Sequence, residues 1–134
     1  MSAGWVGVDL DATLAHYDGW QGEGVIGEPV PRMLARIKEH LAAGEEVRIL
    51  TARVWWDRDL PAGMVRNAEV GRVCLETRAI ETWCVRHLGR RLRVTCEKDH
   101  AMRFCYDDRC RQVVANSGEL VEDLVPGGFH GRGR

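Results

Sequence analysis

The chain has 134 residues, enough for one domain with a single core and too few for a second folded unit such as a large cap domain. It carries 19 Lys and Arg residues against 20 Asp and Glu residues, and the formal net charge of −1 gives no overall attraction to nucleic acid or to an anionic membrane. The apolar runs are only a few residues long, which argues against a secretory signal or a membrane-spanning helix and predicts a cytoplasmic protein.

Two further features of the composition bear on the organisation of the chain. The 5 cysteines form no Cys-x-x-Cys pair and are odd in number, so we expect reduced, mostly buried thiols rather than a disulfide framework. The final residues read Pro-Gly-Gly-Phe-His-Gly-Arg-Gly-Arg, a composition typical of a flexible tail. We therefore expect one folded domain over residues 1–125, followed by a tail over 126–134.

The first predicted element is a short strand that ends at two carboxylates. Val6 and Val8 alternate with glycines, which suits a strand buried on both faces, and Asp9 and Asp11 follow directly. With a period of two, both carboxylates project to the same side, close enough to share one cation or one substrate group. A calcium-binding loop is excluded by its register, because Leu14 stands where such a loop requires Gly.

The chain then alternates between helical and strand patterns. Apolar residues at helical spacing predict a helix that begins near Pro31 and stops at Gly44. A strand follows over residues 47–50 and ends at Thr51. This order is typical of a helix that crosses between two strands of one sheet.

The same succession recurs in the second half of the chain. A helical pattern over residues 70–88 stops before Gly89, and an apolar run over residues 92–96 predicts a strand that ends just before Lys98. Two shorter apolar runs complete the pattern. One covers residues 104–106 and closes on Asp107-Asp108, and the other covers residues 113–114.

Strands that alternate with helices predict an α/β fold. We expect a Rossmann-like three-layer sandwich with a mostly parallel central sheet of about five strands and no large cap domain. In such a sheet the carboxyl ends of the strands open onto one rim, where ligands bind. Asp9, Thr51, Lys98 and Asp107-Asp108 therefore converge by topology, although they are far apart in the sequence.

Four short motifs carry these residues, in the order VDLDAT, RILTAR, CEKD and YDDR. In this order they resemble the motifs of the haloacid dehalogenase-like superfamily of phosphohydrolases, and the resemblance spans residues 5–110. One departure is Ala12, where the family commonly has Gly, because Ala resists a backbone conformation with positive φ. Receiver domains of two-component signalling gather similar residues, but there the adjacent acidic pair comes first and Lys comes last. Here Lys98 precedes Asp107-Asp108.

The resemblance implies a magnesium-dependent phosphomonoester hydrolase. Asp9 would attack phosphorus to form an aspartyl-phosphate, and Asp11 would serve as general acid and base. Thr51 would donate a hydrogen bond to a phosphoryl oxygen, and Lys98 would add a positive charge beside the phosphate. These four residues form the predicted catalytic set.

The resemblance also implies a set of magnesium ligands. The ion would be held by Asp9, by the backbone carbonyl of Asp11, and by Asp107 or Asp108, and it would screen the repulsion between the nucleophile and the phosphate. Thr13 is placed in the phosphate-binding loop, either in contact with the substrate or fixing the loop.

The segment Thr-Ala-Arg, residues 51–53, looks like the Ser-Gly-Arg of polynucleotide 3′-phosphatase domains, in which the arginine grips the substrate phosphate. Arg53 is therefore a candidate substrate-binding residue, and the alternative is an ion pair with Asp57 or Asp59. Trp55 and Trp56 follow, either to stack on a nucleobase or to lie half-buried in the core.

The segment over residues 15–28 is too short for a cap domain, and we expect it to form a flap in which His16, Tyr17 and Trp20 shape substrate choice. We expect an open site of this kind to take a phosphorylated small molecule or a nucleic-acid end. Alternatively, the chain forms a homo-oligomer in which a second copy supplies the cover. The alternative function, of another class, is a non-catalytic binding or scaffold domain that keeps the fold and a metal site.

Overall fold

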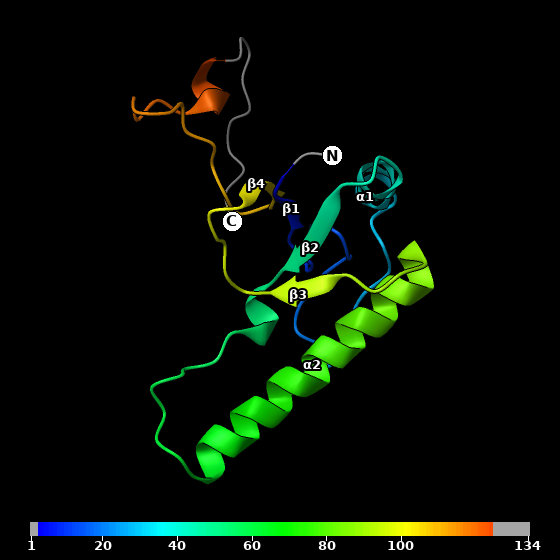
Figure 1. Ribbon diagram of the computed structural model, residues 1–134, viewed down its shortest axis with the longest axis vertical. Helices are drawn as coiled ribbons and strands as arrows, with labels where there is room; N and C mark the ends of the chain where they lie inside the picture. Colours follow the sequence, from blue (N-terminus) through cyan, green and yellow to red (C-terminus); the bar gives the residue numbers. More distant parts are fainter. Residues whose placement is uncertain (1–2, 125–134) are drawn as a thin grey trace.

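The computed structural model describes residues 3–124 (Figure 1). Its elements, in chain order, are β1 (Trp5–Val8), α1 (Pro31–Ala42), β2 (Glu46–Leu50), the short 3-10 helix η1 (Ala52–Val54), α2 (Met64–Leu88), β3 (Arg93–Thr95), β4 (Met102–Tyr106) and the 3-10 helix η2 (Val121–Leu124). The predicted tail over 126–134 lies outside the described residues. Within residues 3–124, no helix combines the length and apolar character that crossing a membrane requires.

The four strands form one parallel sheet in the order β3-β2-β1-β4. The predicted α/β class and the parallel sheet are confirmed, and no cap domain is present among residues 3–124. The sheet has four strands rather than about five. The last apolar run, residues 113–114, forms no strand of this sheet, because Val113 makes only an isolated antiparallel bridge with Leu120.

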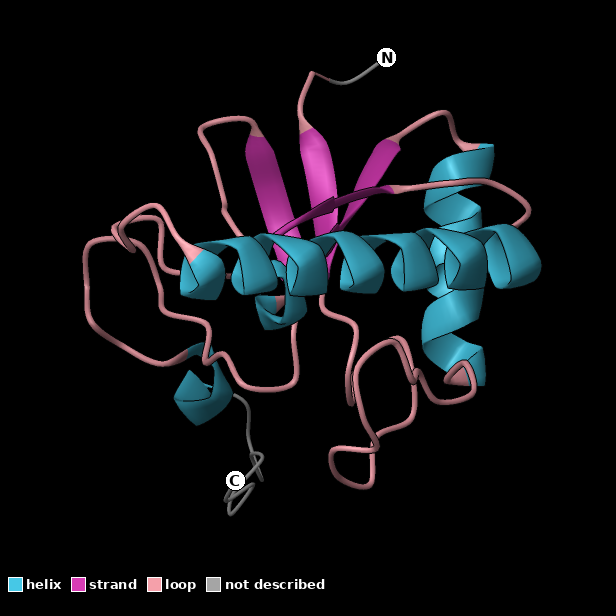
Figure 2. Cartoon of the chain, turned by 90° about the horizontal axis from the view of Figure 1, so that it is seen from below, coloured by secondary structure: helices cyan, strands magenta, loops and turns pink. Residues whose placement is uncertain are grey.

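Both helices pack against the same face of the sheet. Val6 of β1 and Val47 of β2 lie in register, and they share one buried cluster with Ile37 of α1 and with Ile80 and Trp83 of α2. Right-handed crossovers from β1 to β2 and from β2 to β3 advance in the same direction, so both place their helices on one side. Figure 2 shows α2 lying across this face. The described domain therefore has two layers of regular structure where three were expected.

A short loop takes the place of the expected third layer. Residues 96–101 connect β3 to β4, and this stretch is too short to hold a crossover helix. On this side of the sheet the buried ring of Trp5 lies under the guanidinium of Arg48, 4.5 Å from the ring centre. The Nε1–H group of Trp5 donates a hydrogen bond to Asp99 at 2.8 Å.

The long helix α2 ends where the sequence predicts, because Gly89 adopts φ 77° and its N–H closes the last turn on Val85. It begins at Met64, earlier than the apolar periodicity indicated. Its first turns extend beyond the sheet (Figure 1), and Cys74 is consequently exposed. All five cysteines are free, but only Cys84 is buried, which corrects the expectation of mostly buried thiols.

Candidate active site

A cleft of about 650 Å³ lies at the carboxyl edge of the sheet. Its walls come from the segments that follow all four strands and from the middle of α2. The lining residues are Asp9, Asp11, Ala12, Tyr17, Trp20, Leu50, Thr51, Ala52, Arg53, Trp55, Arg72, Glu76, Cys96, Asp107, Asp108 and Arg109. The structure thus brings together six of the eight predicted site residues, whereas Thr13 and Lys98 do not line the cleft.

Three carboxylates form a cluster in this cleft. The N–H of Asp9 donates to the carbonyl of Tyr106 at 2.9 Å, which continues the pairing of β1 with β4 and carries Asp9 beside Asp107 and Asp108. Their carboxylate oxygens lie within 4.8 Å of one another. Burial, followed by the negative charges of Asp107 and Asp108, raises the pKa of Asp9 from 3.8 to about 7.

Thr13 holds two members of this cluster in place. Its buried Oγ1 lies 3.3 Å from Asp9 Oδ2 and 3.1 Å from Asp108 Oδ1, and it accepts a hydrogen bond from the Asp108 N–H at 3.1 Å. The hydroxyl has one proton, so it donates to one of the two carboxylates at a time. In this structure Thr13 fixes the loop, the second of the two roles considered for it.

The donor set of Asp9, Asp107 and Asp108 fits a hard divalent cation. All three offer carboxylate oxygens, the ligands that Mg²⁺ and Ca²⁺ prefer over nitrogen and sulfur. A cation would also offset the repulsion that raises the pKa of Asp9. Among the described residues this is the one group of acidic, His and Cys side chains close enough to hold a metal ion.

The carboxylate of Asp11 is engaged elsewhere. Arg53 donates to both of its oxygens, from Nε at 2.7 Å and from NH2 at 2.8 Å, in a bidentate ion pair. The same guanidinium donates from NH1 to Glu76 Oε1 at 3.2 Å. Arg53 thus pairs with Asp11 and Glu76 rather than with Asp57 or Asp59.

This ion-pair network is largely shielded from water. The side chains of Arg53 and Glu76 are 6% and 1% exposed, and that of Asp11 is 23% exposed. Burial by itself lowers the pKa of the Arg53 guanidinium, but hydrogen bonds and charges from Asp11 and Glu76 raise it above its ordinary value. Arg53 therefore stays charged and orients Asp11 toward the cleft.

Thr51 is placed to donate a hydrogen bond into the cleft. It is 3% exposed, and its Oγ1 accepts a hydrogen bond from the Arg53 N–H at 3.2 Å, which caps η1. A threonine hydroxyl keeps its own proton when its oxygen accepts such a bond. Thr51 therefore has a donor left for a bound oxyanion.

The loop between Asp9 and Thr13 contains a strained residue. Ala12 has φ 67°, in the left-handed region that L-residues avoid. The turn that requires this conformation is closed by the Leu14 N–H on the Asp9 carbonyl and by the Ala12 N–H on the Ala15 carbonyl, at 3.3 and 2.8 Å. Ala12 thus adopts the positive φ that its methyl group opposes.

Lys98 lies on the loop between β3 and β4 and is exposed. Burial and the negative charge of Asp107 raise the pKa of the Cys105 thiol, whereas the positive charge of Lys98 acts to lower it. The side chain of Lys98 is not part of the cleft wall.

The segment over 15–28 leaves the cleft and returns to it. The His16 N–H donates to the Glu28 carbonyl at 2.8 Å, which closes the segment at its base. Tyr17 and Trp20 line the cleft, whereas His16 lies in a neighbouring hollow and pairs with Asp18 at 3.0 Å. Of the two adjacent tryptophans, Trp55 lines the cleft and Trp56 does not.

The sequence analysis missed Glu76 and Arg72. Glu76 lies on the buried stripe of α2 between Val73 and Ile80, at helical spacing, so a carboxylate within an apolar stripe was the available signal. Arg72 donates to the carbonyls of Arg53 and Trp55 at 2.8 and 2.6 Å and so holds the loop after β2. Nothing in the local sequence indicates that Arg72 contacts these two carbonyls.

Comparison with known proteins assigns no family. No family model and no curated protein matches the chain. A solved structure of a conserved protein from Bacteroides thetaiotaomicron is similar, with 18% sequence identity, a TM-score of 0.45, and coverage of 81% of this chain and 78% of that one. A similarity at this level identifies neither a family nor an activity. The chain is a small Rossmann-like parallel α/β domain with an aspartate triad that could bind a metal ion.

Proposed function

We propose that this chain is a magnesium-dependent phosphomonoester hydrolase that acts through an aspartyl-phosphate on Asp9. The observation that carries the proposal is the aspartate triad at the carboxyl edge of a parallel sheet, in one cleft with Asp11 and Thr51. The resemblance of the four motifs to the haloacid dehalogenase-like superfamily supports the same reaction. The substrate would be a phosphorylated small molecule or a nucleic-acid end.

Asp9, Asp107 and Asp108 are the side chains that would hold the ion. When bound, Mg²⁺ supplies positive charge that lowers the repulsion between a carboxylate nucleophile and a phosphate. The proposed coordination by the Asp11 backbone carbonyl is an additional expectation from the motif. The Asp11 carboxylate itself is held by Arg53 and lies outside the triad.

In the first half of the proposed reaction, a carboxylate oxygen of Asp9 forms a bond to phosphorus while the bond from phosphorus to the leaving oxygen breaks. Asp11 gives a proton to that leaving oxygen, and Arg53 fixes the direction in which Asp11 points. Thr51 donates its hydroxyl proton to a phosphoryl oxygen.

In the second half, water attacks the phosphorus of the aspartyl-phosphate, Asp11 accepts the proton from the water, and the Asp9 carboxylate leaves. Lys98 would contribute a positive charge beside the phosphate, a role that requires its loop to carry the side chain into the cleft.

One observation favours the alternative of a non-catalytic metal-binding domain. Both carboxylate oxygens of Asp11 are engaged by Arg53, whereas a general acid needs one of them free to carry and deliver a proton. A domain of this second kind would bind the cation at the triad and turn over no phosphomonoester.

The decisive test is hydrolysis of para-nitrophenyl phosphate with Mg²⁺ or with EDTA. We expect turnover that requires Mg²⁺, is abolished by Asp9→Asn, and is reduced about 10²- to 10⁴-fold by Asp11→Asn, the range for loss of an acid-base group. Asp59→Asn, in an exposed loop outside the cleft, is the matched control and should retain activity. Mg²⁺ binding without turnover of any phosphomonoester would instead support the non-catalytic domain.

A further inference from the structure

The rim of the cleft carries exposed aromatic side chains from two loops. Tyr17 and Trp20 come from the segment after β1, and Trp55 comes from the segment after β2. They are 40%, 56% and 59% exposed. Scattered exposed aromatics are ordinary, but a group of them around one cleft is typical of a ligand-binding surface.

The backbone that carries the first two rings is held in place. The returning half of their segment is tied to α2 by the Gly24 N–H to Glu76 Oε1 at 2.9 Å, and by Trp83 Nε1–H to the Gly27 carbonyl at 2.9 Å. The ring of Trp20 packs against the Arg53 guanidinium, 4.9 Å from the ring centre. Since Arg53 also binds Asp11, the Arg53 side chain lies between this ring and the Asp11 carboxylate.

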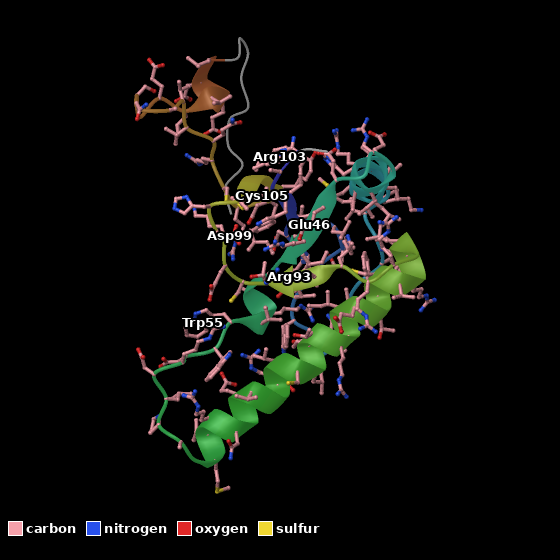
Figure 3. The ribbon with its side chains drawn as sticks, viewed as in Figure 1. Glu46, Trp55, Arg93, Asp99, Arg103 and Cys105 are labelled. Carbon is pink, nitrogen blue, oxygen red and sulfur yellow. The ribbon has the colours of Figure 1, made fainter. Side chains whose placement is uncertain are left out.

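Trp55 is held in a comparable way. Its N–H bonds to the Ala52 carbonyl at 3.1 Å and its carbonyl accepts from Arg72 at 2.6 Å, while the ring itself stays exposed. Figure 3 shows Trp55 on the chain that leaves η1. A fixed backbone with an exposed ring is preorganised for stacking, because little conformational entropy is lost when a flat ligand binds.

We infer that the cleft selects nucleoside monophosphates, with the phosphate at the aspartate triad and the base stacked on Trp20 or Trp55. This inference rests on the proposed function and names its substrate class. Bases stack on aromatic side chains regardless of their identity, because every base has a π-face. A cleft of about 650 Å³ also falls within the volume range of pockets for small-molecule ligands larger than a single ring.

The charges around the cleft favour a single nucleotide over a nucleic-acid strand. A strand is bound along a basic groove that follows its backbone. Of the three arginines that line the cleft, Arg53 is paired with Asp11 and Arg72 with Glu69 at 2.9 Å, which leaves Arg109 as the one lining arginine without an ion pair among the described residues. The described lining therefore offers no continuous row of cations for successive phosphates.

The test compares adenosine 5′-monophosphate with ribose 5-phosphate, which has the same phosphate and sugar but an anomeric hydroxyl in place of the base. With Mg²⁺ we expect kcat/KM to be at least roughly fivefold higher for the nucleotide, the factor that one stacked base supplies at the low end of its range. Trp20→Ala and Trp55→Ala should lower this ratio toward one, because they remove the surface on which the base stacks.

Trp56→Ala is the matched control. Trp56 adjoins Trp55 in the sequence, but its ring lies against Arg66 and Arg58, at 4.8 and 5.8 Å, outside the cleft. It should leave the ratio unchanged. Equal kcat/KM for the two substrates in the parent chain, or an equal loss for both in the Trp20 and Trp55 variants, would overturn the inference.

A binding measurement separates this inference from the proposed function. Calorimetric titration of the parent chain with each compound in the presence of Mg²⁺ should show tighter binding of adenosine 5′-monophosphate even if nothing is hydrolysed. Nucleotide binding without turnover would refute the hydrolase and keep the base-stacking cleft. Hydrolysis without preference for the nucleotide would keep the hydrolase and refute the cleft assignment, and neither binding nor turnover would refute both.

Discussion

At the scale of single residues, the site depends on groups held in unfavourable states. Asp9 is a partly buried carboxyl beside two other carboxyls, and Ala12 is an L-residue with positive φ. Such features persist only where the surrounding structure enforces them, and they cluster at functional sites. Each of them has a measurable effect on stability.

The raised pKa of Asp9 predicts that the metal-free protein loses stability as the pH rises. Its pKa is about 7 in the folded state, against an ordinary value of 3.8 for an aspartate in water, so the folded state binds more protons between these values. The free energy of unfolding therefore falls as the pH increases through this window. In EDTA, the melting temperature of the parent chain should fall more steeply than that of Asp9→Asn between about pH 4 and pH 7.

Addition of Mg²⁺ supplies the complementary measurement. At about pH 8 the ion should raise the melting temperature of the parent chain, because it binds the folded state, and it should raise that of Asp9→Asn much less. Asp59→Asn is again the control and should behave as the parent. Parallel pH dependences of the parent and Asp9→Asn in EDTA would show that Asp9 titrates normally.

The positive φ of Ala12 predicts that glycine at this position stabilises the fold. A positive φ costs an L-residue roughly 1–2 kcal/mol, and the greater freedom of glycine in the unfolded chain returns part of that, so Ala12→Gly should gain about 0.5–1 kcal/mol in urea unfolding. Ala43, at φ −81° after α1, is the control, and Ala43→Gly should be destabilising. A loss of stability in both variants would mean that Ala12 is not strained.

At the scale of elements, α2 links the segment over 15–28 to Arg53 in η1. Among the carboxylates of residues 64–88, all of which the structure describes, only that of Glu76 is buried, and its Oε1 accepts hydrogen bonds from both Gly24 and Arg53. Oε2 is buried without a hydrogen-bond partner. A buried acceptor of this kind is costly, and it persists here beside the buried Arg53 guanidinium, whose charge Glu76 helps to offset.

Loss of the Glu76 charge should therefore destabilise the protein. Glu76→Gln leaves the buried Arg53 with one carboxylate instead of two, and we expect roughly 3 kcal/mol lower stability in chemical unfolding, as for other broken buried ion pairs. Glu81→Gln on the same helix is the control. Glu81 reaches an exposed arginine, Arg91, only at 4.0 Å, so its replacement should cost no more than about 0.5 kcal/mol. Equal effects of the two substitutions would show that Glu76 does not stabilise Arg53.

At the scale of the whole molecule, the sheet is covered by helices on one face only. Both crossovers that contain helices run in one direction, and the loop over 96–101 closes the other side around Trp5 and Asp99. No separate domain covers the cleft within residues 3–124, and the rings of Trp20 and Trp55 at its rim are exposed. An open cleft of this kind suits the flat ligand proposed above.

The sequence by itself determined the class of fold and the convergence of the acidic residues. Alternation of apolar strands with amphipathic helices dictates parallel strands, and parallel strands bring their carboxyl ends to one edge. Asp9, Thr51, Lys98 and Asp107-Asp108 were predicted to meet for that reason, and all of them except Lys98 line one cleft. The end of α2 could also be predicted from the sequence, because Gly89 adopts the left-handed conformation that ends a helix.

Only the tertiary structure decided which charges pair and which face of the sheet is covered. Arg53 had several carboxylates within reach along the chain, but it bonds Asp11 and Glu76, which come from other elements. The absence of a helix between β3 and β4 removed the expected third layer. Ion pairs and layers depend on distances between segments remote in sequence, and local patterns of hydrophobicity carry no information about those distances.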